Sequence, residues 1–336
     1  MKRHIVILGA GFSGVSGALS ADSCLKSQDA SDILVTVLAP LPMPHHAPYP
    51  DEAGTETMDA LLHDLLSNSR IKYVAGIANK IDVHSRRVIY TAAQGIKSWI
   101  SYDKLILATG SHVVRPNLEG VEHAFDVNPT DTSACMEKHF TALGSYPDSD
   151  ARNTVVICGG GFPGLESAKR LPARLRGSLG ADVQINVIVI DCGTEIGARM
   201  DGRSNPLLAQ AVAEQDIEWH VNAKVASLDT NGITLVDGRR IESKTVVWTA
   251  GYRASRLTEQ VNAERDALGR LHVDQNLQVT AQPDIYAVGD VAILSAMDNG
   301  YYPTPSYKVA CSMGHLAGHN VVAELTGKPL KDYHPA

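Results

Sequence analysis

The feature that most constrains this chain is a glycine-rich turn placed directly after an apolar run near its start. The run His4–Leu8 leads into Gly9-x-Gly11-x-x-Gly14, which predicts a strand, a tight turn and a helix start, the opening of a dinucleotide-binding βαβ unit. Gly9 would allow the turn, Gly11 would let the backbone approach a pyrophosphate, and Gly14 would let helix and strand pack closely. The phosphates would then bind N–H groups at the positive end of the helix. Such a turn also occurs for packing alone, so the motif needs support.

The same pattern occurs again in the middle of the chain. Thr154–Cys158 is a second apolar run, and it leads into Gly159-x-Gly161-x-x-Gly164. Two such units predict two dinucleotides bound by two related domains. The 336 residues provide enough chain for two domains of ordinary size.

Composition excludes several other classes of protein. Hydrophobic residues make up 44% and charged residues 20% of the chain, as in globular proteins with a real core. The net charge of −7 argues against nucleic acid as a partner. No apolar run approaches the roughly 20 residues of a membrane span, and the first predicted strand begins too near Met1 for a secretory signal. The five cysteines form no C-x-x-C pair, so we predict a cytoplasmic protein with no cysteine metal site and no redox-active disulfide.

The residues at two strand ends differ between the halves. In this architecture a carboxylate at the end of the second strand accepts the ribose hydroxyls. The run Ile33–Leu38 ends instead in Ala39-Pro40. In the second half the run Val183–Ile190 ends in Asp191, which would bind the ribose and repel a 2′-phosphate, favouring NADH. Arg199 and Arg203 follow and would weaken that preference, so NADPH stays possible; Asp191 could also be an ordinary strand-end carboxylate.

The rest of the chain repeats at domain scale. Each half continues through short strand-like pieces, within 71–100 and 217–241, that suggest antiparallel meanders. Further strands end at Thr109-Gly110, Ala250-Gly251 and Gly289-Asp290, and a last helix covers Tyr307–Glu324. A proline-rich loop, 41–54, contains His45 and His46, whose setting is more typical of a solvated surface than of a metal site.

Five motifs together resemble one family. GAGFSG, YDKLILATGS, GGGFPGLE, VVWTAG and IYAVGD are similar to the FAD/NAD(P) pyridine nucleotide oxidoreductases with two dinucleotide-binding domains. The resemblance extends from Ile5 to about Asn320 and is greatest to type II NADH dehydrogenases, with apoptosis-inducing-factor-like reductases next. It implies an α/β fold of two Rossmann-like domains of the three-layer ββα type, the second inserted into the first. The FAD domain would be 1–115 with 275–336, and the NAD(P)H domain 116–274.

The resemblance also implies which residues bind FAD in the first domain. The pyrophosphate, the adjoining flavin atoms and the ribityl chain would be held by Gly9, Gly11, Ser13, Gly14, Thr109, Gly110, Gly289 and Asp290. The helix beginning near Lys308 and Val309 would direct its N-terminus at the N1/O2 edge of the flavin and stabilise the reduced ring.

The second cofactor, NADH, would bind Gly159, Gly161, Gly164 and Asp191, with Ala250 and Gly251 beside the nicotinamide. Glu166 would reach toward the nicotinamide–flavin contact, and it is a candidate catalytic residue together with Lys308. The alternative for Glu166 is a carboxylate in the first turn of a helix, favoured by the helix dipole. The implied reaction is hydride transfer from NADH to flavin N5, followed by reoxidation by an acceptor that is often a quinone in this family.

The chain departs from the family in three ways. Ala39 replaces the ribose-binding carboxylate, the cysteine pair of the disulfide reductases is missing, and the chain ends where quinone-linked members continue into amphipathic membrane-binding helices. We therefore expect a soluble protein. Cys311 could be a redox thiol, as in the related sulfide:quinone reductases, or an inert buried thiol. His315 and His319 share a helix face but have no acidic partners in the sequence, which argues against a metal site.

Three functional hypotheses follow. The first is an FAD-dependent NADH oxidoreductase that reduces a quinone-like or small aromatic acceptor. The second is a reductase of a protein electron carrier of the ferredoxin or rubredoxin type, although the net charge of −7 does not suggest a basic docking surface. The third, motivated by Ala39, is a degenerate flavoprotein without enzyme activity. The oligomeric state stays open.

Overall fold

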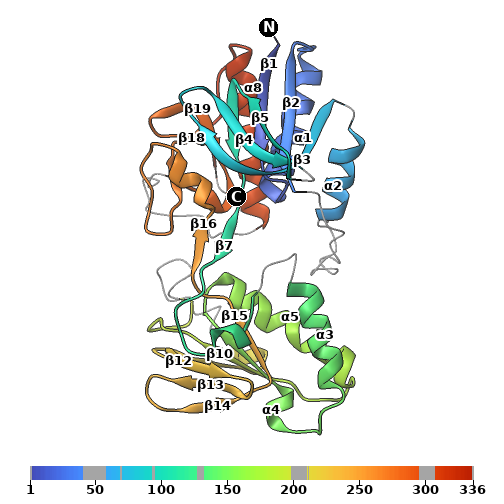
Figure 1. Ribbon diagram of the computed structural model, residues 1–336, viewed down its shortest axis with the longest axis vertical. Coiled ribbons are helices and arrows are strands. Elements are labelled where there is room, and N and C mark those ends of the chain that lie inside the picture. Colours follow the sequence, from blue (N-terminus) through green and yellow to red (C-terminus); the bar gives the residue numbers. More distant parts are fainter. Residues whose placement is uncertain are drawn as a thin grey trace. The chain divides into compact units, whose positions relative to one another are not determined.

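The computed structural model describes residues 2–40, 58–68, 70–92, 95–126, 132–197, 210, 212–294 and 307–334. The chain divides into two compact units, 1–112 with 253–336, and 113–252 (Figure 1). Two short paired strands, β7 (Ser111–Val113) and β16 (Tyr252–Ala254), carry the chain from one unit to the other. The predicted loop with His45 and His46, and both Arg199 and Arg203, lie outside the described residues.

The first unit is built on a sheet of ten strands, with a parallel centre and mostly antiparallel flanks. The sheet order is β20 (Ala292–Leu294), β17 (Leu271–Val273), β18 (Gln278–Val279), β19 (Gln282–Ala287), β6 (Lys104–Leu107), β1 (Arg3–Leu8), β2 (Ile33–Ala39), β3 (Ile71–Asp82), β4 (Arg87–Ala92) and β5 (Lys97–Ser101). The central strands are continuous apolar runs because both faces are covered, and Ile5–Leu8 is fully buried. Residues 253–274 belong to this unit, since β17 joins its sheet.

In the part of the first unit that the structure describes, the α-helices are α1 (Phe12–Ser27), α2 (Met58–Ser67) and α8 (Tyr307–Leu325). Glycines let α1 and α8 pack backbone to backbone. A Cβ at Gly314 would lie 2.1 Å from the carbonyl oxygen of Ser13, and a Cβ at Gly318 would lie 2.1 Å from that of Gly17. No side chain fits at these two positions. The two glycines therefore allow the backbones of α1 and α8 to come into contact.

The second unit has three layers. Its central sheet is fully parallel, in the order β11 (Ile217–His220), β10 (Asn186–Ile190), β9 (Thr154–Cys158), β15 (Thr245–Trp248) and β8 (Phe125–Asp126). An antiparallel sheet of β12 (Val225–Asp229), β13 (Gly232–Leu235) and β14 (Arg240–Glu242) forms a second layer. The helices with described bounds in this unit include α3 (Thr132–Leu143), α4 (Asp150–Asn153) and α5 (Phe162–Leu179).

Alternate residues of β9 face different layers of the second unit. Val155 and Ile157 pack in the same cluster as residues of α3 and α5. Val156 and Cys158 pack in a different cluster, with residues of β12 and β13. This period of two follows from strand geometry, and it confirms the predicted α/β class with ββα layering in this unit.

The antiparallel meander predicted within 71–100 is present, since β3 pairs with β4 and β4 with β5. However, β3 is one long strand that also pairs parallel with β2, which was not predicted. Ile217–His220 is no meander strand, because it adds to the parallel sheet beside β10. In both cases short alternating runs carry no information on the partner strand.

Candidate functional site

In the first unit, three strands end at one edge of the sheet. Leu8, Leu107 and Ala287 are in register on β1, β6 and β19, so the residues that follow them meet at the carboxyl edge. Parallel sheets bind ligands at this edge. The predicted residues of the first glycine turn, Thr109-Gly110 and Gly289-Asp290 therefore gather in one place, although they come from three distant parts of the sequence.

The first glycine turn has the geometry that its spacing predicts. Gly9 has φ of +105°, and a Cβ there would lie 2.2 Å from the carbonyl oxygen of Ala108. A Cβ at Gly14 would lie 2.0 Å from the carbonyl oxygen of Gly9. A Cβ at Gly11 meets no atom within 4 Å. Gly9 and Gly14 are therefore required for packing, whereas Gly11 faces open space at the N-cap of α1, which no side chain caps.

Polar groups around this turn fit a dinucleotide. The Thr109 Oγ1 atom is buried and has no hydrogen-bond partner among the described residues. Gly110 adopts φ of +62° with no atom near its Cβ position. Ser13 is buried against Gly289, whose Cβ would lie 2.9 Å from the Ser13 Oγ atom. An unsatisfied hydroxyl beside an open helix N-terminus fits the phosphates and hydroxyls of FAD.

Asp290 is held by a residue that sequence analysis missed. The Ser111 hydroxyl donates to Asp290 Oδ2 at 2.6 Å. Ser111 directly follows the Thr109-Gly110 turn, so its place in the ATGS motif could have indicated this contact. The bond orients a carboxylate at the edge where the ribityl hydroxyls are expected.

The first residues of α8 lie against the glycine turn. The ring centroids of Phe12 and Tyr307 are 5.8 Å apart, and Lys308 Nζ is 5.8 Å from the Tyr307 centroid. The Lys308 side chain is exposed and Val309 is half-buried. Cys311 Sγ lies 4.0 Å from the carbonyl oxygen of Phe12. The start of α8 and the first glycine turn thus form one continuous surface of the first unit.

The second glycine turn repeats the geometry of the first. Gly159 has φ of +132°, and its Cβ would lie 2.6 Å from Thr249 Oγ1. A Cβ at Gly164 would lie 1.9 Å from the carbonyl oxygen of Gly159. A Cβ at Gly161 would meet only Pro163 Cδ, at 3.7 Å. The middle glycine is again the one that leaves room for a ligand.

Asp191 lies beside this turn with one oxygen unsatisfied. The residue is 1% exposed, and its Oδ1 accepts the N–H of Gly193 at 2.9 Å. Its Oδ2 is buried without a partner in the described part of the chain, and it lies 2.0 Å from the Cβ position of Gly160. A buried carboxylate oxygen normally has a donor, and a ribose hydroxyl would supply one. The sequence analysis did not predict the close approach of Asp191 to Gly160, although Gly160 lies within the second glycine motif, 159–164.

The remaining predicted residues of the second unit have structural partners. Glu166 forms an ion pair with Arg170, 3.4 Å from Oε1 to Nη2. The alternative that placed Glu166 in the first turn of a helix is wrong, because α5 begins at Phe162 and has no acidic residue in its first turn. The carbonyl oxygen of Ala250 accepts the Trp248 Nε1–H at 3.1 Å, and Gly251 has φ of +83°.

Three other positions considered in the sequence analysis, Ala39, Cys158 and His319, are buried or half-buried. Ala39 is buried and pairs with Ala75, with no carboxylate in its place. Burial raises the pKa of the Cys158 thiol to about 12, so this cysteine stays protonated. His319 Nδ1 lies 3.3 Å from Cys24 Sγ, and the described residues contain no cluster of three His, Cys, Asp or Glu side chains able to hold a metal.

Among the described helices, none combines the length and apolarity needed to cross a bilayer.

The chain is similar in sequence or fold to several known proteins. The chain is 37% identical over 332 residues to an NADH dehydrogenase-like protein of Mycobacterium tuberculosis, covering 97% of this chain and 82% of that one. It is 24% identical to a type II NADH:quinone oxidoreductase of Staphylococcus saprophyticus, with 99% and 85% covered. The covalent putidaredoxin reductase–putidaredoxin complex has the same fold, with a TM-score of 0.71 and 19% identity over 98% of this chain and 77% of that one.

Residues 3–314 match the model of one family, described as pyridine nucleotide-disulphide oxidoreductase. The match covers both glycine turns, the Thr109-Gly110 turn and Asp290, which the geometry above brings to the edges of the two sheets. The chain belongs to the pyridine nucleotide-disulphide oxidoreductase family and is an FAD-dependent NAD(P)H oxidoreductase related to type II NADH dehydrogenases.

Proposed function

We propose that the protein oxidises NADH through FAD bound in its first unit and passes the electrons to a quinone-like or small aromatic acceptor. The observation that carries this proposal is the pair of glycine turns, each open only at its middle glycine, Gly11 or Gly161. Each open turn lies beside an unsatisfied buried oxygen, Thr109 Oγ1 in the first unit and Asp191 Oδ2 in the second. The two proposed binding sites therefore share the same backbone geometry at the glycine turn but differ in the polar group beside it, a hydroxyl in the first unit and a carboxylate in the second.

The preference for NADH rests on Asp191. Its free Oδ2 would accept a ribose hydroxyl, and its negative charge would repel the 2′-phosphate of NADPH. Because Gly160 has no side chain, the carboxylate approaches the backbone of the turn closely. In this proposal Asp191 is the group that selects NADH over NADPH.

The bound flavin would supply the two-electron chemistry that no side chain of this chain provides. Gly9 and Gly14 would hold the turn in shape, Gly11 would admit the pyrophosphate, and Asp290, fixed by Ser111, would accept hydroxyl donors of the cofactor. We further propose Glu166 and Lys308 as catalytic groups. Arg170 restrains the Glu166 carboxylate. Lys308 is the second residue of α8, the helix that contacts the glycine turn through the Tyr307 and Phe12 rings.

The acceptor is proposed from the relatives. A type II NADH:quinone oxidoreductase is among them, which supports a quinone. A protein carrier is the second candidate, since putidaredoxin reductase shares the fold. One observation favours it: Trp99 and Ile77 are 56% and 58% exposed on the face of β3–β5, and the Arg87 Cζ lies 4.3 Å from the centroid of the Trp99 ring. Tryptophan and arginine are enriched where proteins dock.

The experiment combines a spectrum with two acceptors. The purified protein, loaded with FAD, is titrated anaerobically with NADH while flavin absorption is followed. It is then assayed for NADH oxidation with a water-soluble benzoquinone or with a [2Fe–2S] ferredoxin. Bleaching by NADH and turnover with the quinone support the first proposal, and turnover with ferredoxin alone supports the second. A flavin that NADH does not bleach contradicts both.

A further inference from the structure

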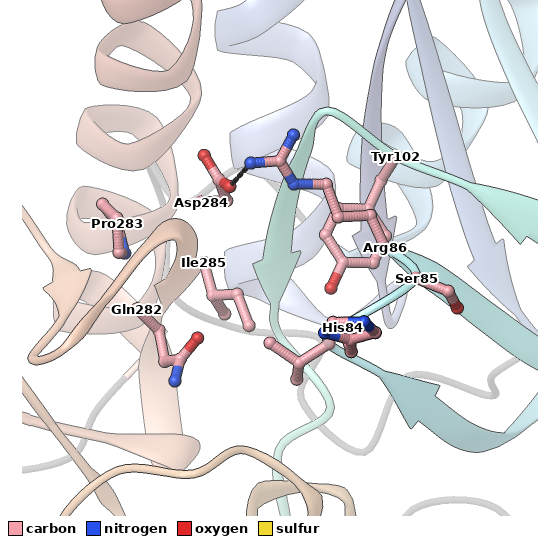
Figure 2. Close-up of a pocket in the computed structure, with 9 residues that line it drawn as sticks. His84, Ser85, Arg86, Tyr102, Gln282, Pro283, Asp284 and Ile285 are labelled. Atoms are coloured by element: carbon pink, nitrogen blue, oxygen red, sulfur yellow. Dashed lines mark hydrogen bonds and ion pairs between the residues drawn. The ribbon is translucent and has the colours of Figure 1, made fainter.

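The first unit contains a cavity at the end of the sheet opposite to the glycine turns. Its volume is about 380 Å³, and it is lined by the β3–β4 turn (83–86), by Tyr102 just before β6, and by 282–285 at the start of β19 (Figure 2). These residues lie at the amino ends of β6 and β19, whereas Thr109 and Gly289 follow the carboxyl ends. The cavity is therefore separate from the candidate FAD site, and neither cofactor accounts for it.

The cavity contains an unsatisfied buried hydroxyl. Tyr102 is 3% exposed, and its hydroxyl has no hydrogen-bond partner in the ranges that the structure describes. Figure 2 shows the hydroxyl pointing into the space between His84 and Ile285. Burial raises the pKa of Tyr102 to about 12, so the group stays protonated near neutral pH and is able to donate. Buried polar groups without partners are rare in native proteins, and a ligand that accepts a hydrogen bond would explain this one.

The Asp284 carboxylate in the cavity wall is already paired with two cations. Lys104 donates to Asp284 Oδ1 at 2.9 Å and to the carbonyl oxygen of Pro283 at 3.0 Å. Arg86 binds the other oxygen of Asp284 through Nη2. The guanidinium group has five N–H donors, so Arg86 retains donors beyond this ion pair. The Ser85 hydroxyl is hydrogen-bonded to the Asp82 carboxylate, whereas the Tyr102 hydroxyl has no partner among the described residues. The donors of Arg86 and Tyr102 fit a ligand that brings acceptors.

Among the described residues, two cations and three carboxylates surround the cavity. The cations, Arg86 and Lys104, are paired with Asp284 and Glu324. Asp82 is half-buried, and its carboxylate accepts the N–H of Ser85 at 3.0 Å. Because there is no excess of positive charge, an anion in this cavity would depend on direct hydrogen bonds from Arg86 and Tyr102.

We propose that this cavity binds a small carboxylate with an apolar body. The carboxylate would accept hydrogen bonds from Tyr102 and from the free N–H groups of Arg86. The side chains of Val83, Pro283 and Ile285 would contact the apolar part. All its residues lie in the first unit, at the sheet edge opposite to the candidate FAD site.

The test uses benzoate as the probe and benzyl alcohol as its uncharged match. Binding to the FAD-loaded protein is measured by saturation-transfer NMR titration for wild type, Tyr102→Phe and Tyr146→Phe. Tyr146 is a tyrosine of the other unit, 47% exposed, and serves as the control. We expect Tyr102→Phe to weaken benzoate binding about 5-fold, the effect of losing one neutral donor, and Tyr146→Phe to leave it unchanged.

A second variant tests the charge. Arg86→Gln should weaken benzoate more than benzyl alcohol, because only the carboxylate uses the guanidinium donors. Equal benzoate affinity in wild type and Tyr102→Phe would overturn the proposal, as would no benzoate binding at all. Equal affinity of wild type for benzoate and benzyl alcohol would also overturn it, since the site would then not select a carboxylate.

Discussion

Replacing Gly11 with alanine tests whether the first turn admits a pyrophosphate. The residue has φ of −77°, which any L-amino acid adopts, and an added Cβ meets no atom within 4 Å. Alanine caps a helix less well than glycine but restricts the unfolded chain more. We therefore expect the free energy of unfolding of the FAD-free protein to change by less than about 1 kcal/mol.

The same methyl group would stand where the pyrophosphate approaches the backbone. Overpacking a filled space costs about 1–3 kcal/mol, which corresponds to FAD binding weaker by about 5- to 150-fold. Gly14→Ala provides the contrast, because its Cβ would lie 2.0 Å from a backbone oxygen of the turn. That variant should lose stability even without FAD, whereas Gly11→Ala should lose only the cofactor.

Gly161→Ala is the matched variant in the second unit. Its φ is −80°, and its Cβ would make one ordinary contact, at 3.7 Å. We measure the flavin-to-protein absorbance ratio after gel filtration, the Kd of FAD for the stripped protein, and the KM for NADH. Gly11→Ala should lower the flavin ratio, and Gly161→Ala should raise KM at a normal flavin ratio. If Gly161→Ala instead lost flavin and Gly11→Ala kept it, the assignment of the two cofactors to the two units would be refuted.

Three other variants test separate parts of the structure. Asp191→Asn should raise the KM for NADH about 10-fold, through loss of a charge-assisted hydrogen bond, and lower the NADH/NADPH ratio of kcat/KM; an unchanged ratio would exclude a role in selection. Gly318→Ala should destabilise the protein by about 1–3 kcal/mol in urea unfolding, because its Cβ would lie 2.1 Å from the carbonyl oxygen of Gly17. Gly177→Ala on α5 is the control, and it should be neutral or stabilising because no atom lies within 4 Å of its Cβ position. Burial lowers the pKa of His139 below 6.5, so the unfolded chain takes up a proton at a higher pH than the folded protein does. The free energy of unfolding should therefore decrease as the pH falls from 6.5 toward 5.5. If the urea midpoint of His139→Gln fell by the same amount over this range, His139 would not be the cause.

The glycine turns were predictable because their requirements are local. The spacing of Gly9, Gly11 and Gly14 within six residues encodes a positive φ, an open position and a close helix–strand contact, and the structure has all three. The gathering of Thr109 and Gly289 at the same edge was also predictable, since parallel strands of an α/β sheet place their ends together.

Other features depend on partners far away in the sequence. Gly314 and Gly318 appear as unfavourable residues inside a helix, and only the contact with α1, some 300 residues earlier, shows why they stand there. The unsatisfied hydroxyl of Tyr102 follows from three separate segments that close around it. Local patterns contain no record of such contacts, and the same limit explains why the parallel partners of β3 and β11 were not predicted.

The two units are nearly identical at their glycine turns, so the difference in what they bind must arise elsewhere. A Cβ at Gly9, Gly14, Gly159 or Gly164 would lie between 1.9 and 2.6 Å from a backbone or hydroxyl oxygen. The units differ one strand away, where a buried alanine stands in the first and a carboxylate with a free oxygen in the second. In our proposal, a dinucleotide in the first unit would be held mainly through its other end, near Asp290 and the start of α8. This difference between the units supports the proposal that FAD binds in the first unit and NADH in the second.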